Sequence, residues 1–133
     1  MNYLKSKLKQ KPQIDTNKKN GIALKAFFTI THKWGLTSDQ ESILLGVPIS
    51  TLYRWKNKKN GALTPDNLER ISYILGIYKA LRILLPTEEA ANKWIKKPNH
   101  APLFNGKSAL DKLMKGHVVD LADVRRYLDA ERG

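Results

Sequence analysis

The sequence predicts an all-α protein in which an N-terminal helix-turn-helix domain is followed by a small helical domain. Three observations support this class. Apolar residues recur at spacings of three and four along most of the chain, which is the period of an amphipathic helix. Ser, Thr and Asp, which cap helices, precede these stretches, and glycine or proline ends several of them. Alternation of the kind found in strands is confined to residues 117–119.

Composition restricts the classes of protein to which this chain can belong. Its 133 residues are 41% hydrophobic and 27% charged, which is the balance of a globular protein. It has no cysteine, which excludes a disulfide scaffold, a thiolate zinc site and a cysteine nucleophile. Lys or Arg interrupts every apolar stretch before the ~20 residues of a membrane span, and the first residues lack the apolar core of a secretory signal. We therefore expect a cytoplasmic protein without a membrane partner.

The net charge of +12 is unevenly distributed along the chain. Residues 1–60 carry 12 Lys or Arg against 3 Asp or Glu, whereas residues 61–133 carry 12 against 9. A positive surplus of this size indicates an anionic binding partner, and a polyanion such as DNA is the first candidate. The distribution indicates that the first half would bind it.

The expected elements begin with a basic segment and a helix. Residues 1–20 are predicted to form a flexible arm; a short helix is the alternative, because Leu4 and Leu8 are about one turn apart. From residue 21 the pattern predicts a helix that stops near Gly35. Its expected apolar residues are Ile22, Leu24, Ala26, Phe27, Ile30 and Trp34.

Two short helices complete the first domain, which we expect to span residues 21–63. The first is predicted over 38–45, capped by Thr37 or Ser38, with Glu41 three residues after Ser38 as in a capping box. Gly46 ends it. Ser50 is expected to cap the second, which runs to about Lys56.

A long core helix over 64–85 is expected to connect this domain to a second one over 86–133. Thr64-Pro65-Asp66 is a strong helix start, and Pro86 ends or kinks the helix. Shorter helices are predicted over 87–96, from 109 to a stop at 116, and over 121–130, the last two capped by Ser108 and Asp120. The intervening loop, 97–107, is expected to bury Leu103 and Phe104 in the core; the alternative is that these two side chains contact a partner.

The helices over 38–45 and 50–57 have the spacing of a DNA-binding helix-turn-helix. Gly46 permits the positive φ of the turn, and the small Ser42 lets the helices approach each other. Four side chains should point inward: Leu45, Val47, Leu52 and Trp55. The outward side chains combine hydroxyls and cations, which suit base edges and phosphates: Ser50, Thr51, Tyr53, Arg54 and Lys56, with Lys58 and Lys59 following. Arg54 is the main candidate. The alternative is a plain helical hairpin with a solvated basic face.

The sequence gives no indication of catalysis, a metal or a cofactor. His32, His100 and His117 lack the spacing of a metal site, and no phosphate-binding glycine motif occurs. The acids Glu88 and Glu89 in a first helical turn are explained by the helix dipole. We therefore expect a protein that is not an enzyme.

Two sets of residues resemble a family of bacterial antitoxins. TSDQESILLGVPISTLYRWKN, residues 37–57, is similar to an Xre-type helix-turn-helix. The second half resembles the C-terminal toxin-binding domain of the Xre/MbcA/ParS antitoxins. The matching positions are Trp94, Pro98-Asn99, Pro102-Leu103-Phe104, Gly106-Lys107-Ser108, Leu110-Asp111, Leu113, Gly116 and residues 129–133. Ala109 stands where many members have proline, a change that a first helical turn tolerates.

The resemblance implies an antitoxin of a type II toxin–antitoxin system. Its partner would be a RES-domain toxin that consumes NAD or transfers ADP-ribose, and the antitoxin would block the toxin's active site. It would also form a homodimer and bind operator DNA to repress its own promoter. The tail residues able to contact the toxin are Tyr127, Glu131, Arg132 and Gly133.

The residues alone leave other functions open. Leu121, Val124, Tyr127 and Leu128 share one face of the last helix, which either packs on its own domain or binds a partner. One alternative is a stand-alone transcriptional regulator whose C-terminal half dimerises or senses a ligand. Another, suggested by the ParS part of the name of the family that the chain resembles, is a structural or centromere-like DNA-binding adaptor, which would occupy many sites rather than one promoter.

Overall fold

The computed structural model describes the backbone of residues 2–133 and the side chains from residue 15 onward. Over residues 2–133 the chain forms seven helices and no strand, which confirms the all-α class. The helices are α1 (Asn2–Lys33), α2 (Ser38–Leu45), α3 (Ile49–Lys58), α4 (Pro65–Leu84), α5 (Glu88–Trp94), α6 (Ala109–Leu113) and α7 (Val118–Glu131).

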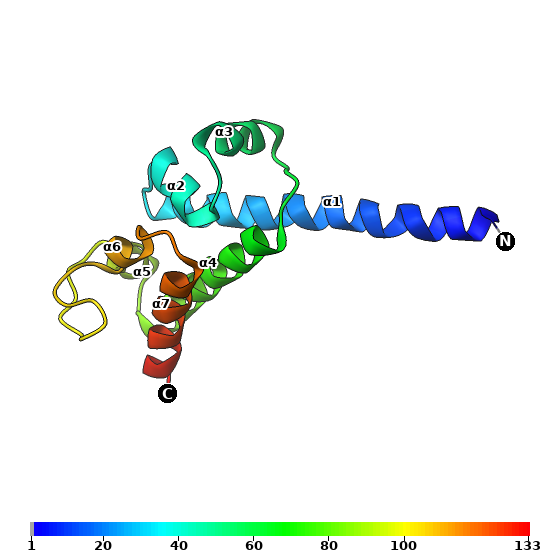
Figure 1. Ribbon diagram of the computed structural model, residues 1–133. Helices are drawn as coiled ribbons and strands as arrows, with labels where there is room; N and C mark the ends of the chain where they lie inside the picture. Colours follow the sequence, from blue (N-terminus) through cyan, green and yellow to red (C-terminus); the bar gives the residue numbers. More distant parts are fainter. Residues whose placement is uncertain (1) are drawn as a thin grey trace.

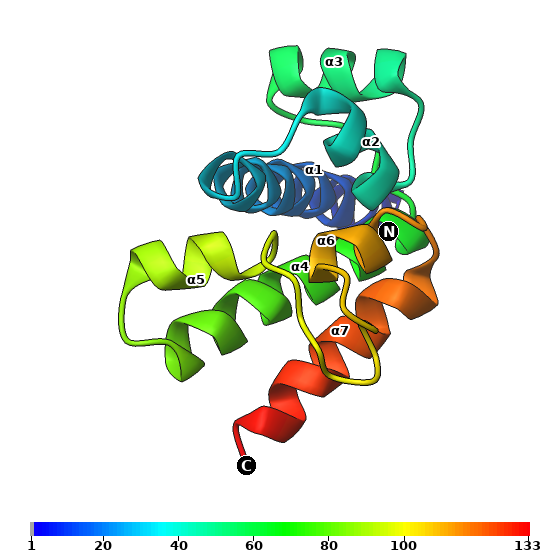
Figure 2. The same cartoon turned by 90° about the vertical axis from the view of Figure 1, so that its left-hand side faces the viewer.

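The long helix α1 separates the other helices into two groups. α2 and α3 lie on one side of α1, and α4 to α7 lie on the other side, as both views show (Figures 1 and 2). α4 packs across α1 and along α7, and it also contacts α2 and α5. The N-terminal half of α1 projects beyond the rest of the molecule (Figure 1).

A single hydrophobic core joins the two groups. α1 contributes Leu24, Phe27, Ile30 and Trp34 to it, as predicted. The buried residues of α4 are Ile71, Ile74, Ile77, Ala80 and Leu81, and those of α7 include Leu121, Val124 and Leu128. Ile22 was expected in this core but is 60% exposed. It is two positions from Leu24, which turns its side chain about 200° around the helix, to the outer face.

The predicted start of the first helix at residue 21 is wrong, because α1 begins at Asn2. Residues 17–20 are tied to the loop after α3: Asn60 Nδ2 donates to the carbonyl of Asn17, and Asn20 Nδ2 donates to the carbonyl of Gly61, both at 3.1 Å. A helix that is already nucleated adds further residues at little cost. The anchored part of α1 can therefore extend through the segment expected to be an arm.

Local capping explains where several helices start. Thr64 caps α4 with Pro65 in the first turn, and Ser108 forms a capping box with Asp111 at α6, both as predicted. At α4 the cap is also a capping box, completed by Asn67, which the sequence pattern did not indicate. At α2 the box is formed by Thr37 and Gln40, not by Ser38 and Glu41. A box needs its two residues three positions apart, and Gln40 meets this condition from the true cap.

Two predicted caps are wrong. Ser50 does not cap α3, which begins at Ile49 after Pro48 and has no side-chain cap. Asp120 does not cap α7, because the helix already begins at Val118 after His117. The short alternating stretch at 117–119 is thus the start of a helix. Asp120 lies in the first turn, where its carboxylate pairs with side chains instead.

Replacing Gly61 by alanine is expected to destabilise the protein by about 1–3 kcal/mol, the usual cost of overpacking a core. A Cβ at Gly61 would lie 2.4 Å from the Trp55 ring, which is 7% exposed and has little room to move. Gly21→Ala is the control, since its Cβ would lie 3.5 Å from the nearest atom in a helix interior. The control should be neutral or stabilising by up to about 1 kcal/mol. Urea unfolding measures the stability of both variants. Equal stabilities of the Gly61→Ala and Gly21→Ala variants would contradict the close packing of Gly61 against Trp55.

Candidate functional site

A sharp turn at Gly46 joins the two helices of the helix-turn-helix. Its φ of 74° is left-handed, a conformation that costs a residue with a Cβ about 1–2 kcal/mol and glycine almost nothing. The N–H groups of Gly46 and Val47 donate to the carbonyl of Ser42, which satisfies the end of α2. The side chains predicted to point inward do so: Leu45, Leu52 and Trp55 are buried and Val47 is half-buried. This packing fixes the angle between α2 and α3.

α3 lies at the edge of the molecule with one face open (Figures 1 and 2). Of the seven side chains expected to contact DNA, six are exposed and Thr51 is half-buried; the exposed ones are Ser50, Tyr53, Arg54, Lys56, Lys58 and Lys59. Tyr53 has 51% of its surface exposed. Arg54, like Lys58 and Lys59, has no ion-pair partner among the residues whose side chains are described. The open face therefore presents hydroxyls and uncompensated cations.

Lys56 differs from the other cations of α3 because it is paired within the domain. Its Nζ lies 2.6 Å from Glu41 Oε1, and the Thr31 hydroxyl donates to Glu41 Oε2, also at 2.6 Å. The Glu41 side chain is only 4% exposed. Lys56 Nζ also lies 5.3 Å from the centre of the Phe28 ring. These contacts join α1, α2 and α3, and they neutralise a carboxylate that burial would otherwise make costly.

The sequence pattern predicts a capping-box role for Glu41, whereas in the structure Glu41 is the buried partner of Lys56 and Thr31. The helical period of the sequence indicates that Glu41 points inward. Glu41 is three and four positions before Leu44 and Leu45, so it shares their inward face. An acid on an apolar face indicates a buried cation or hydrogen-bond donor nearby.

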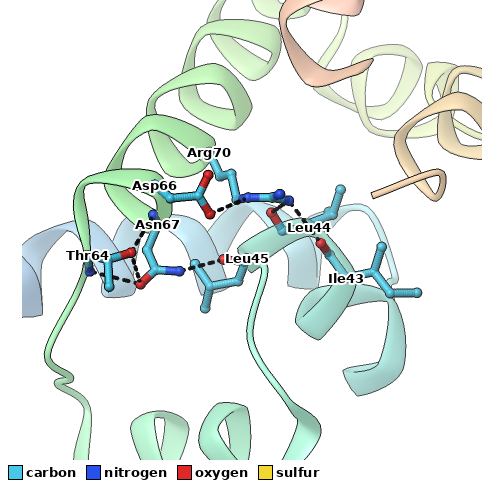
Figure 3. A network of polar contacts seen from close by, with 7 residues as sticks. All are labelled: Ile43, Leu44, Leu45, Thr64, Asp66, Asn67 and Arg70. Carbon is cyan, nitrogen blue, oxygen red and sulfur yellow. Dashed lines mark hydrogen bonds and ion pairs between the residues drawn. The ribbon is translucent and has the colours of Figure 1, made fainter. Parts of the chain in front are cut away.

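The C-terminal end of α2 is held by two side chains of α4 (Figure 3). Asn67 Nδ2 donates to the carbonyl of Leu45 at 2.8 Å. Arg70 Nη1 donates to the carbonyls of Ile43 and Leu44 at 3.3 and 3.4 Å. A cation at this end of a helix also complements the helix dipole. The helix-turn-helix is thereby fixed to the same helix that packs against α7.

Three aromatic rings form a cluster in the second half of the chain. Trp94 and Tyr127 are stacked, with ring centroids 6.5 Å apart, and Phe104 meets both rings edge-on. Phe104 is buried as predicted, whereas Leu103 is 37% exposed and so does not fill the core as expected. The ring of Tyr127, a predicted toxin contact, is half-buried in this cluster. Its ring therefore packs on its own domain.

The other three predicted toxin contacts lie at the end of the chain. Glu131, Arg132 and Gly133 are exposed, at the end of the molecule opposite α3 (Figure 1). Arg132 Nη1 lies 3.6 Å from Asp129 Oδ1, and Asp129 Oδ2 accepts a hydrogen bond from Arg125 Nε at 3.2 Å. The tail thus carries both charges and packs little against the rest of the protein.

A nearly buried ion pair joins α6 and α7. Lys112 Nζ lies 3.2 Å from Asp120 Oδ1 and 3.3 Å from Asp123 Oδ2, and the Lys112 and Asp120 side chains are 13% and 8% exposed. Burial acts to raise the pKa of Asp120, but hydrogen bonding and charge from Lys112, with help from His117, lower it overall. A carboxyl whose pKa falls on folding stabilises the protein above its unfolded pKa, near 4. That contribution is lost as the pH falls through the folded pKa.

Replacing Lys112 by methionine is expected to lower stability at pH 7 by about 2 kcal/mol, because Asp120 would remain nearly buried without its cation. The difference from the unsubstituted protein should narrow as the pH falls, because the unpaired, nearly buried Asp120 of the variant takes up its proton at a higher pH than the paired one. Lys115→Met, at an exposed lysine with no ion-pair partner among the described side chains, is the control. Thermal unfolding from pH 7 to pH 3 measures this. A difference that does not change with pH would show that the charge is irrelevant.

The residues with described side chains contain no group of three or more His, Asp or Glu able to hold a metal ion. His32 and His100 are exposed, and His117 contacts Asp120 at 3.3 Å. Among the described residues, no helix is long and apolar enough to cross a membrane.

The chain thus combines a helix-turn-helix that has an open basic face with a second helical unit that ends in an exposed tail. Residues 14–76 match the family model of the antitoxin Xre-like helix-turn-helix domain. Residues 80–133 match that of the antitoxin Xre/MbcA/ParS C-terminal toxin-binding domain. The chain belongs to the Xre/MbcA/ParS family and is an antitoxin of a toxin–antitoxin system. It is also similar to uncharacterized protein y4oB of Sinorhizobium fredii, with 51% identity over 111 residues, which are 83% of this chain and 84% of that protein.

Proposed function

We propose that this antitoxin neutralises a RES-domain toxin, one that consumes NAD or transfers ADP-ribose, and that it binds operator DNA to repress its own promoter. The kind of toxin rests on the family resemblance. We also propose that it acts as a homodimer on DNA, since one recognition helix covers too few base pairs for operator-level specificity. We propose that the protein binds both partners in the cytoplasm. We also propose that it acts by binding alone and catalyses no reaction.

The separation of the two candidate surfaces is the observation that carries this proposal. The open face of α3 and the C-terminal tail lie at opposite ends of the molecule, with α1 between them (Figures 1 and 2). A toxin bound at the tail would leave α3 free for DNA. The two activities can therefore belong to one chain at the same time.

Occlusion by the tail is the mechanism that these residues support best. Glu131 and Arg132 offer a carboxylate and a guanidinium on a segment with few internal contacts, and Gly133 adds no bulk. Such a segment can enter a cleft of a partner and satisfy polar groups there. At Tyr127 the hydroxyl, rather than the packed ring, would make the contact.

The direct test is to isolate the tagged antitoxin from its source cells and to identify the bound partner by mass. We expect a RES-like protein in a stable complex whose NAD consumption is silenced. Release of the toxin by mild denaturation should restore that activity. An antitoxin that emerges alone, or only with DNA, would contradict the proposal and favour a stand-alone regulator.

A further inference from the structure

The two halves of the chain differ in how many acidic residues accompany their cations. In the C-terminal half, ion pairs with Asp or Glu engage Lys93, Lys112, Arg125, Arg126 and Arg132. The first half of the chain contains exposed lysines that form no ion pair with any described side chain. They are Lys18 and Lys25 of α1, Lys58 at the end of α3 and Lys59, which follows it. Exposed cations without an ion pair to a described side chain, such as Lys107 and Lys115, occur in the C-terminal half too, but residues 1–60 hold 3 Asp or Glu against 12 Lys or Arg, whereas residues 61–133 hold 9 against 12. Net positive charge is therefore concentrated in the half that contains the helix-turn-helix.

The lysines of α1 lie next to the end of α3. Lys18 and Lys25 are seven positions apart, nearly two helical turns, so they share one face of α1. The hydrogen bonds that fix this part of α1 to the loop after α3, from Asn60 to Asn17 and from Asn20 to Gly61, are both 3.1 Å long. The loop begins beside Lys59, so the basic surface continues from α3 onto α1.

A cleft of about 670 Å³ between α1 and α3 lies along this surface. Lys25, Lys33, Lys56 and Lys59 contribute to its lining, and Leu24, Phe28 and Leu36 make part of it apolar. Of the described residues that line it, Glu41 is the acid, and its carboxylate is 4% exposed and already paired with Lys56. Lys33 is also paired, with Glu88 at 2.7 Å. Lys25 and Lys59 form no ion pair with a described side chain, so they supply the charge that makes the potential along the cleft positive, as an anionic partner requires.

We propose that Lys18 and Lys25 of α1, together with Lys59, hold the phosphate backbone of the DNA that flanks the bases read by α3. This inference rests on the proposed operator binding and adds a second contact surface to it. Lysine acts on phosphate as a point charge, and such contacts position a protein on DNA without reading its sequence. An acidic peptide would meet the same lysines, but the continuity of this surface with the open face of α3 favours DNA.

The test compares Lys18→Gln/Lys25→Gln with Lys79→Gln/Lys115→Gln, which removes the same charge from exposed lysines beyond α1. The probes are duplexes from the promoter of its own gene, one with flanking DNA and one trimmed to the operator. In the first variant, the slope of log affinity against log salt should fall by about 2, near 0.9 for each contact. Affinity at low salt should fall about tenfold, the advantage of the flanks should be lost, and the preference for operator over unrelated DNA should persist.

The control variant should behave as the unsubstituted protein, and Lys18→Arg/Lys25→Arg should retain the slope because it keeps both charges. A slope for Lys18→Gln/Lys25→Gln equal to that of the control would overturn the inference, as would a loss of toxin binding in place of DNA binding. Absence of any operator preference in the unsubstituted protein would instead refute the proposed operator function. The slope on unrelated DNA would still test the lysines in that case.

Discussion

Replacing Arg54 by alanine is expected to weaken binding to the promoter duplex by about 10- to 100-fold, the usual loss for an arginine that contacts a base. Arg54 is exposed on the open face of α3 and has no ion-pair partner among the described side chains, so its guanidinium is available to DNA. Sequence preference should fall with affinity, because a bidentate contact to guanine carries sequence information. Fluorescence anisotropy with operator and scrambled duplexes measures both effects.

Two comparison variants distinguish a base contact from a phosphate contact and from a general effect of lost charge. Lys58→Ala should weaken operator and scrambled DNA equally and lower the salt slope by about 1, as expected for a phosphate contact. Arg82→Ala removes the same charge from an exposed position of α4 and should change neither. Toxin binding should survive in all three. If Arg54→Ala also lost the toxin, the two functions would not reside on separate surfaces.

Removing residues 131–133 is expected to impair toxin neutralisation by tenfold or more while DNA binding and stability remain unchanged. The deleted residues are exposed. Apart from main-chain hydrogen bonds, such as those of Arg132 and Gly133, the contact described for them is the 3.6 Å ion pair of Arg132 with Asp129. An exposed pair of this kind contributes at most about 1 kcal/mol to stability. The measurement is the concentration of antitoxin that halves NAD consumption by the toxin.

Tyr127→Phe is the matched variant for the same end of α7. It keeps the ring that stacks on Trp94 and removes the hydroxyl alone, so stability should change little. A loss of neutralisation in this variant would assign the toxin contact to the hydroxyl. If the truncated protein still protected fully against the toxin, occlusion by residues 131–133 would be excluded, whatever the result at Tyr127.

The helix-turn-helix could be predicted because its determinants are local in sequence. A turn needs glycine at a left-handed position, and helical spacing assigns the inward side chains, so Gly46, Leu52 and Trp55 were sufficient. The capping box of Ser108 with Asp111 was found for the same reason. These features can be recognised within a few residues of chain.

Contacts between distant residues could not be predicted in this way. Nothing near Glu41 indicates that its partners are Thr31 and Lys56, and nothing near Arg70 indicates that it caps the carbonyls of α2. These contacts depend on how α1 and α4 cross the helix-turn-helix. A titratable or polar residue on an apolar face indicates that it has a partner. Tertiary packing determines which residue that partner is.

The length of α1 was missed because short basic segments rarely form helices alone. Here residues 17–20 are anchored by Asn60 and Gly61, so the helix continues beyond the residues that bury an apolar face. The predicted domain limits at residues 21, 64 and 86 remain predictions. A single core runs from α1 to α7, and the helix-turn-helix is held by α4 rather than by its own residues alone.

We propose that toxin and DNA bind separate surfaces of one antitoxin. Light scattering with mass determination tests this most directly, on a mixture of the antitoxin, its copurified toxin and the promoter duplex at matched concentrations. We expect one assembly that contains all three components, with DNA affinity retained when the toxin is bound. Displacement of the toxin by DNA, or of DNA by an equivalent amount of toxin, would contradict the claim, because the two partners would then share a surface.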